Sequence, residues 1–278
     1  MSTSRLSGMP ATVRSPSKRD FSLVARTGYA ARGVIYLIVG GLAALAAFGR
    51  GGGTTGSRGA LTELLNAPFG TVLLAVVAIG LLCYSAWRAT QAFMDADGHG
   101  TDLKGLLIRG GLAVSAIIHV GLAFFALSLI FGQEHGGSSD ASSQEWTAWL
   151  MSQPFGQWLV ALVGAAVIGA GIAHFIKAWT AKFERHFDMN ARERKFITPV
   201  SRVGLFARGV AFVLIGGFFV VAAWQQDPSE ARGLSGALQT LQQQPYGWAL
   251  LGLLAIGLVA FGIYSLLESR YRRVAIPG

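Results

Sequence analysis

The chain has 278 residues, of which 52% are hydrophobic and 13% charged, and its mean hydropathy is +0.48. Soluble domains carry about 25% charged residues, so this composition excludes an ordinary soluble globular protein. The net charge of +9 comes from basic residues that flank apolar segments, which favours anionic lipid over nucleic acid as a partner.

Met1 to Asp20 is polar, basic and rich in Ser and Pro, without the apolar core of a cleavable signal peptide, and we expect a disordered cytoplasmic tail. Six apolar segments follow, each with the roughly 20 residues that a helix needs to cross about 30 Å of hydrocarbon. They are Tyr29 to Phe48, Phe69 to Ala89, Gly110 to Phe131, Phe155 to Trp179, Leu205 to Trp224, and Tyr246 to Leu267. No Asp, Glu, Lys or Arg lies in the middle third of any of them. The chain is therefore predicted to be an all-α integral membrane protein with six transmembrane helices.

Three connections carry apolar residues at helical spacing just before a Pro-aromatic-Gly motif. These residues are Leu61, Leu64 and Leu65; Trp146, Trp149 and Leu150; and Leu234, Leu238 and Leu241. We expect short helices in the outer membrane interface, each stopped by the Pro, with the Gly permitting the turn into the next span. A merely tethered loop is the alternative.

The basic residues lie almost entirely on one side of the predicted spans. Twenty of the 23 fall on the side of the termini, and only Arg50, Arg58 and Arg232 fall on the other. Lys and Arg mark cytoplasmic loops, so both termini are predicted to be cytoplasmic.

The sequence repeats itself three times. Arg26-Thr-Gly28-Tyr-Ala-Ala-Arg32-Gly33 corresponds to Arg202-Val-Gly204-Leu-Phe-Ala-Arg208-Gly209, and Pro-Phe-Gly or Pro-Tyr-Gly recurs at Pro68, Pro154 and Pro245. The repeats are predicted at 21–93, 103–187 and 198–273. Each holds two spans, so successive repeats are parallel and can form a pseudo-threefold ring, although a linear arrangement is not excluded.

These motifs, with the closing Glu268-Ser-Arg270-Tyr271-Arg272-Arg273, resemble the bacterial membrane family called domain of unknown function 1206. The resemblance covers roughly Phe21 to Val274. It implies six spans in three repeats and supplies no catalytic residues. The middle repeat departs from the pattern, because Ser115 stands where the others have Arg32 and Arg208.

Arginines at the inner border are the first candidate site residues. Arg26 and Arg32 are six positions apart, so they point to different sides of a helix, and the same holds for Arg202 and Arg208. One of each pair can reach lipid phosphates while the other faces the bundle. Contact with an anionic headgroup or solute is thus predicted for Arg26, Arg32, Arg109, Arg202 and Arg208, with a purely topological role as the alternative.

Polar residues inside the spans are the second set: Tyr84, Ser115, His119 and His174. They could contact a proton or solute, although structural hydrogen bonding is the simpler reading. Haem ligation by His119 and His174 is disfavoured because their depths differ. Asp95 to Asp102 fails as a calcium loop, since its twelfth position is Leu106, and one cysteine, Cys83, excludes a zinc site built on several thiolates.

The residues therefore favour a non-enzymatic structural or lipid- or small-molecule-interacting protein without catalytic residues, metal or cofactor. Membrane lipids are the predicted partners, through anionic headgroups at the cytoplasmic face, and protein partners cannot be inferred. The alternative is a small-solute or ion transporter or channel with a polar path that includes His119.

Overall fold

The computed structural model describes residues 18–132 and 139–274, and within them the fold is helical apart from one β-bridge between Phe187 and Arg272. The predicted disordered tail, residues 1–20, lies outside the described residues except for its last three, which begin helix α1. The prediction of an all-α chain is therefore confirmed for the described residues.

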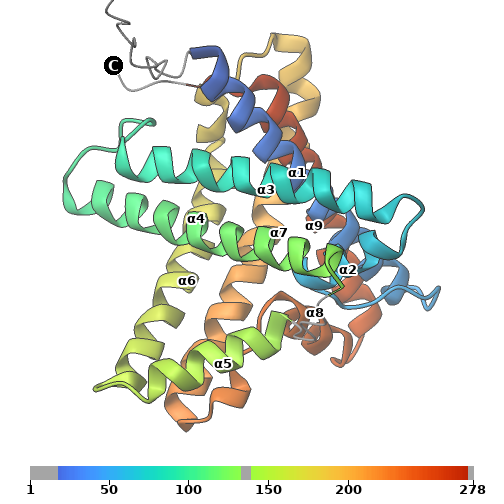
Figure 1. Cartoon of the computed structure of the whole chain (residues 1–278), viewed down its shortest axis with the longest axis vertical. Coiled ribbons are helices and arrows are strands. Elements are labelled where there is room, and N and C mark those ends of the chain that lie inside the picture. The colour runs from blue at the N-terminus through green and yellow to red at the C-terminus, as the bar shows by residue number, and fades with distance from the viewer. Residues whose placement is uncertain (1–17, 133–138, 275–278) are drawn as a thin grey trace, which may run out of the picture.

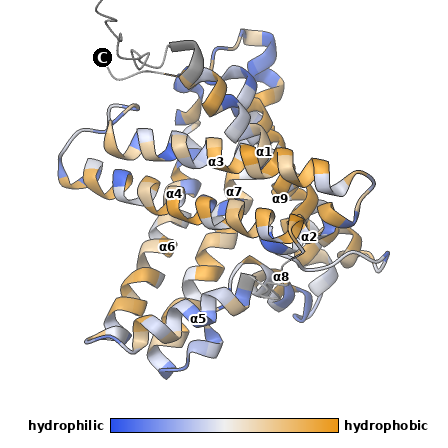
Figure 2. Cartoon of the chain, in the orientation of Figure 1, coloured by the Kyte–Doolittle hydropathy of each residue, from blue (hydrophilic) through white to orange (hydrophobic). Residues whose placement is uncertain are grey.

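Six helices are long and apolar enough to cross a membrane, as predicted. They are α1 (Lys18–Ala47), α3 (Gly70–Phe93), α4 (Leu103–Ile130), α6 (Gly156–Thr180), α7 (Ala191–Gln225) and α9 (Gly247–Tyr271) (Figure 1). Hydrophobic residues line these helices, and hydrophilic ones gather toward their ends and in the connections (Figure 2). The chain is a multi-pass membrane protein.

Several helices begin earlier than the apolar segments predict. α7 starts at Ala191, well before Leu205, because Asn190 and Glu193 form a reciprocal capping box at its first turn. Asp102 likewise caps α4 by accepting a hydrogen bond from the backbone of Gly105. Hydropathy detects the part of a helix that suits lipid, whereas these polar caps extend the helices beyond it.

Short helices form where amphipathic stretches were predicted: α2 (Ser57–Asn66), α5 (Ser139–Met151) and α8 (Leu234–Gln242), with the 3-10 turns η1 (Lys182–His186) and η2 (Pro228–Glu230) elsewhere. The turn that follows each short helix differs from the prediction that its Gly permits the turn. The left-handed residue is the aromatic one, at φ +59° to +60° in Phe69, Phe155 and Tyr246. Gly70 is needed for close approach instead, since a Cβ there would lie 2.6 Å from the carbonyl oxygen of Leu64.

The long helices pack in pairs that join different repeats. α1 packs along α9, α4 along α3, and α7 along α6, while α1–α3 and α7–α9 make the contacts within the outer repeats. Figure 1 shows the α3–α4 pair running across the view and the α6–α7 pair running down it. Among the described residues, no comparable packing joins α4 to α6. The two spans of the middle repeat therefore do not pack closely on each other, whereas the two spans of the first and of the third repeat do.

Glycine sets the distance within two of these pairs. A Cβ on Gly33 of α1 would lie 2.9 Å from the carbonyl oxygen of Gly262 on α9. A Cβ on Gly209 of α7 would lie 3.0 Å from the carbonyl oxygen of Gly171 on α6. Small residues allow backbones to approach in lipid, where apolar burial drives no association. The α1–α9 and α6–α7 pairs are thus built by equivalent contacts.

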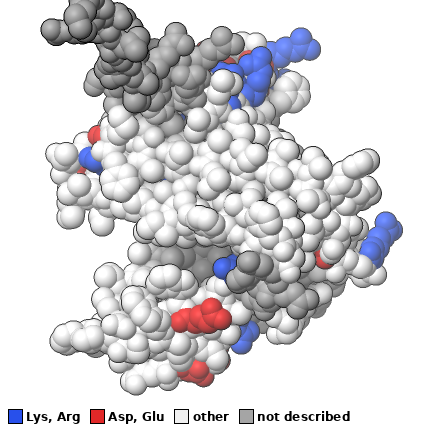
Figure 3. Space-filling view, in the orientation of Figure 1, with Lys and Arg blue, Asp and Glu red and all other residues white. Residues whose placement is uncertain are grey.

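The two ends of the molecule differ in charge. We call the basic end the one at which α1, α4 and α7 begin and α3, α6 and α9 end; α2, α5 and α8 lie at the opposite end. Uncharged atoms cover the band over α3 and α4, and charged side chains appear at its margins (Figure 3). The candidate site lies at the basic end.

Candidate functional site

Arg32 of α1 is the centre of a buried polar cluster at the basic end. Its side chain is 6% exposed, and its guanidinium donates to the carboxylate of Glu268 and the hydroxyl of Tyr84. Its Nε also donates to the Ser265 hydroxyl at 3.1 Å. Since α1 packs on α9 through Gly33, the Arg32 side chain is held directly against the last two turns of α9.

Aromatic rings surround the same guanidinium. Its central carbon lies 5.2, 5.0 and 5.1 Å from the ring centres of Tyr29, Tyr84 and Phe261. Rings at this distance attract a cation through their quadrupole, and more strongly when water is excluded. The Arg32 charge is therefore stabilised by a carboxylate on one side and by π-faces on the others.

The ion pairing continues outward to the connection between α3 and α4. Arg272 donates to Glu268 at 2.9 Å and to both oxygens of Asp97 at 2.9 and 3.1 Å. We call Arg32, Glu268, Arg272 and Asp97 the buried charge network. Burial alone would raise the pKa of Asp97, but the Arg272 guanidinium prevails and holds that pKa below its usual value. The network thus connects α1, α9 and the α3–α4 connection by alternating charges.

A second branch reaches Asp97 along α3. Arg88 donates to the Tyr84 hydroxyl at 2.7 Å and to Gln91 at 3.0 Å, and Gln91 donates to Asp97 at 2.5 Å. Trp87 donates to the Tyr29 hydroxyl at 3.0 Å. The carboxylates of this cluster are therefore engaged by cations or amides from neighbouring helices. Such an arrangement stabilises helix positions.

Arg109 and Arg202, two predicted lipid contacts, instead cap helix ends. Arg109 donates to the carbonyls of Ala92 and Phe93 at 2.7 and 3.1 Å, at the end of α3. Arg202 donates to the carbonyl of Trp179 at 3.2 Å, at the end of α6. Cations suit these positions, where helix carbonyls lack backbone partners.

The other predicted arginines divide as follows. Arg32 is not at the lipid surface, because its packing on α9 makes it part of the buried charge network. Arg208 is half-buried, donates to the Tyr36 hydroxyl, and forms no ion pair with a described carboxylate. Arg26 is exposed, and in the described residues no hydrogen bond or ion pair engages its guanidinium.

The intramembrane histidines bond to their own helices. His119 contacts the carbonyl of Ser115 through Nδ1 at 2.7 Å, and its ring packs 4.5 Å from that of Tyr84. His174 contacts the carbonyl of Ala170 at 2.8 Å, and its ring lies 5.3 Å from that of Phe212. Tyr84 and His119 are buried.

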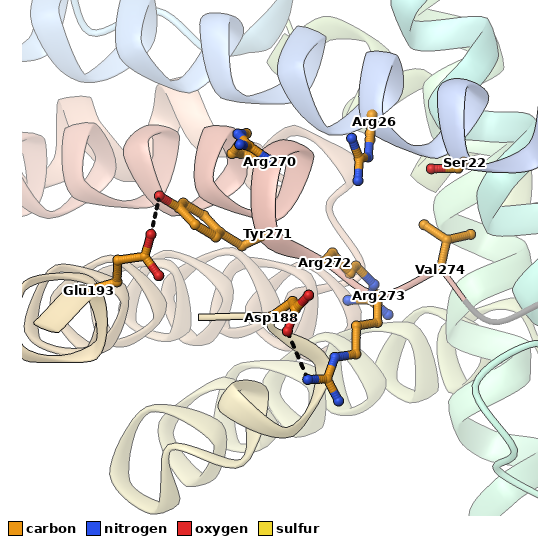
Figure 4. A pocket seen from close by; sticks show the side chains of 9 residues that line it. All are labelled: Ser22, Arg26, Asp188, Glu193, Arg270, Tyr271, Arg272, Arg273 and Val274. Carbon is orange, nitrogen blue, oxygen red and sulfur yellow. Dashed lines mark hydrogen bonds and ion pairs between the residues drawn. The ribbon is translucent and has the colours of Figure 1, made fainter. Parts of the chain in front are cut away.

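A pocket of about 330 Å³ opens at the basic end between α1, the end of α9 and the start of α7. It is lined by Ser22, Arg26, Asp188, Glu193, Arg270, Tyr271, Arg272, Arg273 and Val274 (Figure 4). Its two carboxylates are engaged: Asp188 pairs with Arg273 at 2.9 Å, and Glu193 accepts from the Tyr271 hydroxyl at 3.2 Å. We call this the basic-end pocket.

The comparisons agree with this architecture. The family model "Domain of Unknown Function (DUF1206)" matches three times, at residues 27–95, 110–181 and 203–272. The chain belongs to this family. It is also similar to a Bacillus subtilis (strain 168) protein named "Uncharacterized protein YxxB", with 38% identity over 252 residues, covering 90% of each chain. No solved structure matches.

The three DUF1206 matches confirm the predicted tandem repeat and give the arginines their context. Arg26, Arg109 and Arg202 are equivalent positions. The guanidinium groups of Arg109 and Arg202 donate hydrogen bonds to carbonyls at the end of the preceding span. Arg26 lies one position before the first family match, and it lines the basic-end pocket instead.

Sequence reasoning missed Glu268, Arg272 and Asp97 as a site. Glu268 is the sole carboxylate within α9, and Arg272 follows it by four positions, a spacing that puts both on one helix face. These signals could have marked Glu268 as paired. The identity of its main partner could not be found in this way, because Arg32 lies 236 positions away.

Proposed function

We propose that this DUF1206 protein is a non-enzymatic module of the bacterial cytoplasmic membrane that binds anionic lipid headgroups at its basic end. The observation that carries the proposal is the basic-end pocket, where Arg26 and Arg270 are both exposed. In the described part of the chain, neither forms an ion pair. Guanidinium groups that lie near a membrane surface without a carboxylate suit lipid phosphates.

The proposed orientation places this pocket at the cytoplasmic surface, with both termini on the same side. It is supported by the excess of Lys and Arg at the basic end. A reporter enzyme that works in the cytoplasm should be active when it is fused after Gly278. Activity of a periplasm-dependent reporter at that position would contradict the orientation.

We further propose that the three repeats are parallel and related by a pseudo-threefold axis, with α2, α5 and α8 in the outer interface. The repeated pairing of α1 with α9, α4 with α3 and α7 with α6 supports this arrangement. The exposed aromatic residues Phe69, Phe155 and Tyr246, which follow the short helices, suit an interfacial position. Because α4 and α6 do not pack closely on each other, the ring is incomplete in the middle repeat.

The non-enzymatic part of the proposal rests on how the polar groups are used. Glu268 and Asp97, the buried carboxylates of the site, are held by arginines. In the described residues, no three His, Cys, Asp or Glu side chains gather as metal ligands would. A structural role for the buried charge network and headgroup binding at the basic-end pocket account for these residues without assigning them a role in catalysis.

The binding test uses the full chain in nanodiscs of neutral phosphatidylcholine with increasing phosphatidylglycerol. The double variant R26Q/R270Q should reduce the number of phosphatidylglycerol molecules retained after extraction into neutral detergent, read by native mass spectrometry. Arg50→Gln, which removes one positive charge at the opposite end, is the control and should retain the wild-type number. Equal retention by the double variant and wild type would reject the pocket as a headgroup site.

The transporter alternative needs a polar path through His119. The packing of His119 on Tyr84 supports the binding module over this alternative. Proteoliposome flux decides between them: the proposal expects no flux above that of empty liposomes for protons, monovalent cations or small anions. Flux that disappears in His119→Ala would favour the transporter.

A further inference from the structure

The α6–α7 pair repeats the construction of the α9–α1 pair but carries different charges. Counted from the Gly of each Pro-aromatic-Gly motif, Glu268 of α9 corresponds to Lys177 of α6, and Ser265 corresponds to His174. The equivalent glycine contacts confirm this register, because Gly33 meets Gly262 as Gly209 meets Gly171. In the α6–α7 pair, the position equivalent to the one that neutralises Arg32 therefore holds a cation.

Arg208 is compensated only in part. It donates to the Tyr36 hydroxyl, and its guanidinium carbon lies 4.8, 4.5 and 4.6 Å from the rings of Tyr36, Phe212 and Phe261. The His174 ring packs against the same Phe212 ring and lies within electrostatic range of Arg208. A guanidinium at this depth normally has an anionic partner. Within the described residues, Arg208 has none.

Lys177 adds to this excess of positive charge. It is half-buried, with its ammonium 5.6 Å from the ring centre of Tyr264. Glu268 acts on it only at longer range, because the two carboxylate oxygens of Glu268 already pair with Arg32 and Arg272. The α6–α7 pair thus presents two cations on neighbouring helices where the α9–α1 pair presents an ion pair.

The region around Arg208 is open toward the lipid between the two spans of the middle repeat. α4 and α6 lack the packing seen between α1 and α3 or between α7 and α9. Apolar side chains on both helices remain exposed, including Ile117 and Ile118 on α4 and Ile172 and Ile176 on α6. Acyl chains can therefore lie between these helices while a headgroup reaches Arg208.

We infer that Arg208, Lys177 and His174 form a second site, which binds the phosphate of an anionic phospholipid that enters from the membrane between α4 and α6. Lys177 lies three residues before the end of α6, which places the cations near the level of inner-leaflet phosphates. A phosphate there supplies the negative charge that Glu268 supplies in the α9–α1 pair. The inference rests on the proposed binding of anionic lipid at the basic end but assigns a separate site.

The test measures the thermal shift of the delipidated full chain in neutral detergent on addition of phosphatidylglycerol, phosphatidylcholine or inorganic phosphate. Phosphatidylglycerol alone should raise the melting temperature of the wild type. Arg208→Gln and Lys177→Gln should weaken its apparent affinity by about tenfold, as expected for the loss of one charge-assisted contact. Lys195→Gln, the same change at an exposed position of α7, should leave it unaltered.

A charge reversal sharpens the result. Lys177→Glu places at this position the residue type found at the equivalent site of α9, so it gives Arg208 an internal partner and should abolish the Arg208-dependent binding. Wild-type affinity in Arg208→Gln and Lys177→Glu would overturn the inference, as would equal shifts from phosphatidylcholine. A shift from inorganic phosphate alone, or dimerisation that closes the site, would overturn the lipid as occupant. R26Q/R270Q separates the two sites, because it should retain the shift that depends on Arg208.

Discussion

Arg32 on α1 donates a hydrogen bond to the carboxylate of Glu268 on α9, so the first and last spans of the chain share one buried ion pair. The pair is 236 positions apart in sequence. It is extended by Arg272 to Asp97, which lies between α3 and α4. Four charged side chains thereby fix the relative positions of two spans and one connection.

Replacing Glu268 by Gln should strongly destabilise the protein. The change leaves both Arg32 and Arg272 without their shared carboxylate, and an uncompensated buried charge costs about 3–5 kcal/mol. The free energy of unfolding, measured by titrating mixed micelles with dodecyl sulfate, should fall by this amount. Glu145→Gln on the exposed face of α5 is the matched control and should change it little. A similar small change in both variants would show that the ion pair is not structural.

Neighbouring glycines should respond in opposite ways to a single methyl group. A Cβ on Gly40 would lie 2.8 Å from the backbone nitrogen of Val259, whereas a Cβ on Gly41 meets nothing within 4 Å. Gly40→Ala should therefore lower stability by about 1–3 kcal/mol through overpacking. Gly41→Ala should be neutral or slightly stabilising because Ala is the better helix former. Thermal melting of the two variants checks this contrast.

The repeat makes the same contrast testable a second time. A Cβ on Gly216 would lie 2.8 Å from the backbone nitrogen of Ile168, while one on Gly217 meets nothing within 4 Å. Gly216→Ala should destabilise the protein and Gly217→Ala should not. Destabilisation by both members of either pair would mean that helix propensity or lipid contact, rather than helix approach, governs these positions.

Removing the charge of Asp97 should loosen the connection between α3 and α4. Asp97→Asn weakens its contacts with Arg272, and loss of a hydrogen bond to a charged group costs about 2 kcal/mol. Hydrogen exchange of residues 94–102 should accelerate. Asp188→Asn disrupts an ion pair with Arg273 in which both side chains are exposed, so its effect should be small. Unchanged exchange in Asp97→Asn would exclude Asp97 as the anchor of this connection.

Acidification should destabilise the protein partly through His186. Burial, together with the nearby Arg272 charge, lowers the pKa of His186 from 6.5 to about 4. Between these values the unfolded chain binds a proton that the folded chain does not, so stability is lost as pH falls from 6.5 toward 4. Melting temperatures of the wild type should fall across this range, and those of His186→Asn should fall less. Parallel curves would assign the acid sensitivity to other groups.

Much of the architecture follows from local signals in the sequence. Hydropathy finds the six spans, and the recurring Pro-aromatic-Gly motif finds the repeat, because both need only short windows of sequence. The same windows misplace the start of α7, since Asn190 and Glu193 extend it into polar sequence. They also assign the turn before α3 to Gly70, whereas Phe69 adopts the left-handed conformation.

The site was predictable only in parts. The inner-border arginines were predicted from the sequence, and helix geometry explains why Arg26 is exposed while Arg32 is buried. Glu268 was overlooked because its meaning depends on α1 packing against α9 rather than only against its own repeat partner α3. The repeat register shows that Lys177 stands at the position equivalent to Glu268. This difference gains a meaning only when the α6–α7 and α9–α1 pairs are known to be equivalent.

The pairing of α1 with α9 has a consequence for biosynthesis. The ribosome delivers α1 to the membrane first and α9 last, since chains emerge from the N-terminus. Until α9 is made, Arg32 faces the nascent bundle without the Glu268 carboxylate, a costly state for a charge at this depth. A chain that stops before α9 therefore carries an unneutralised arginine. The final helix completes the electrostatics of the first.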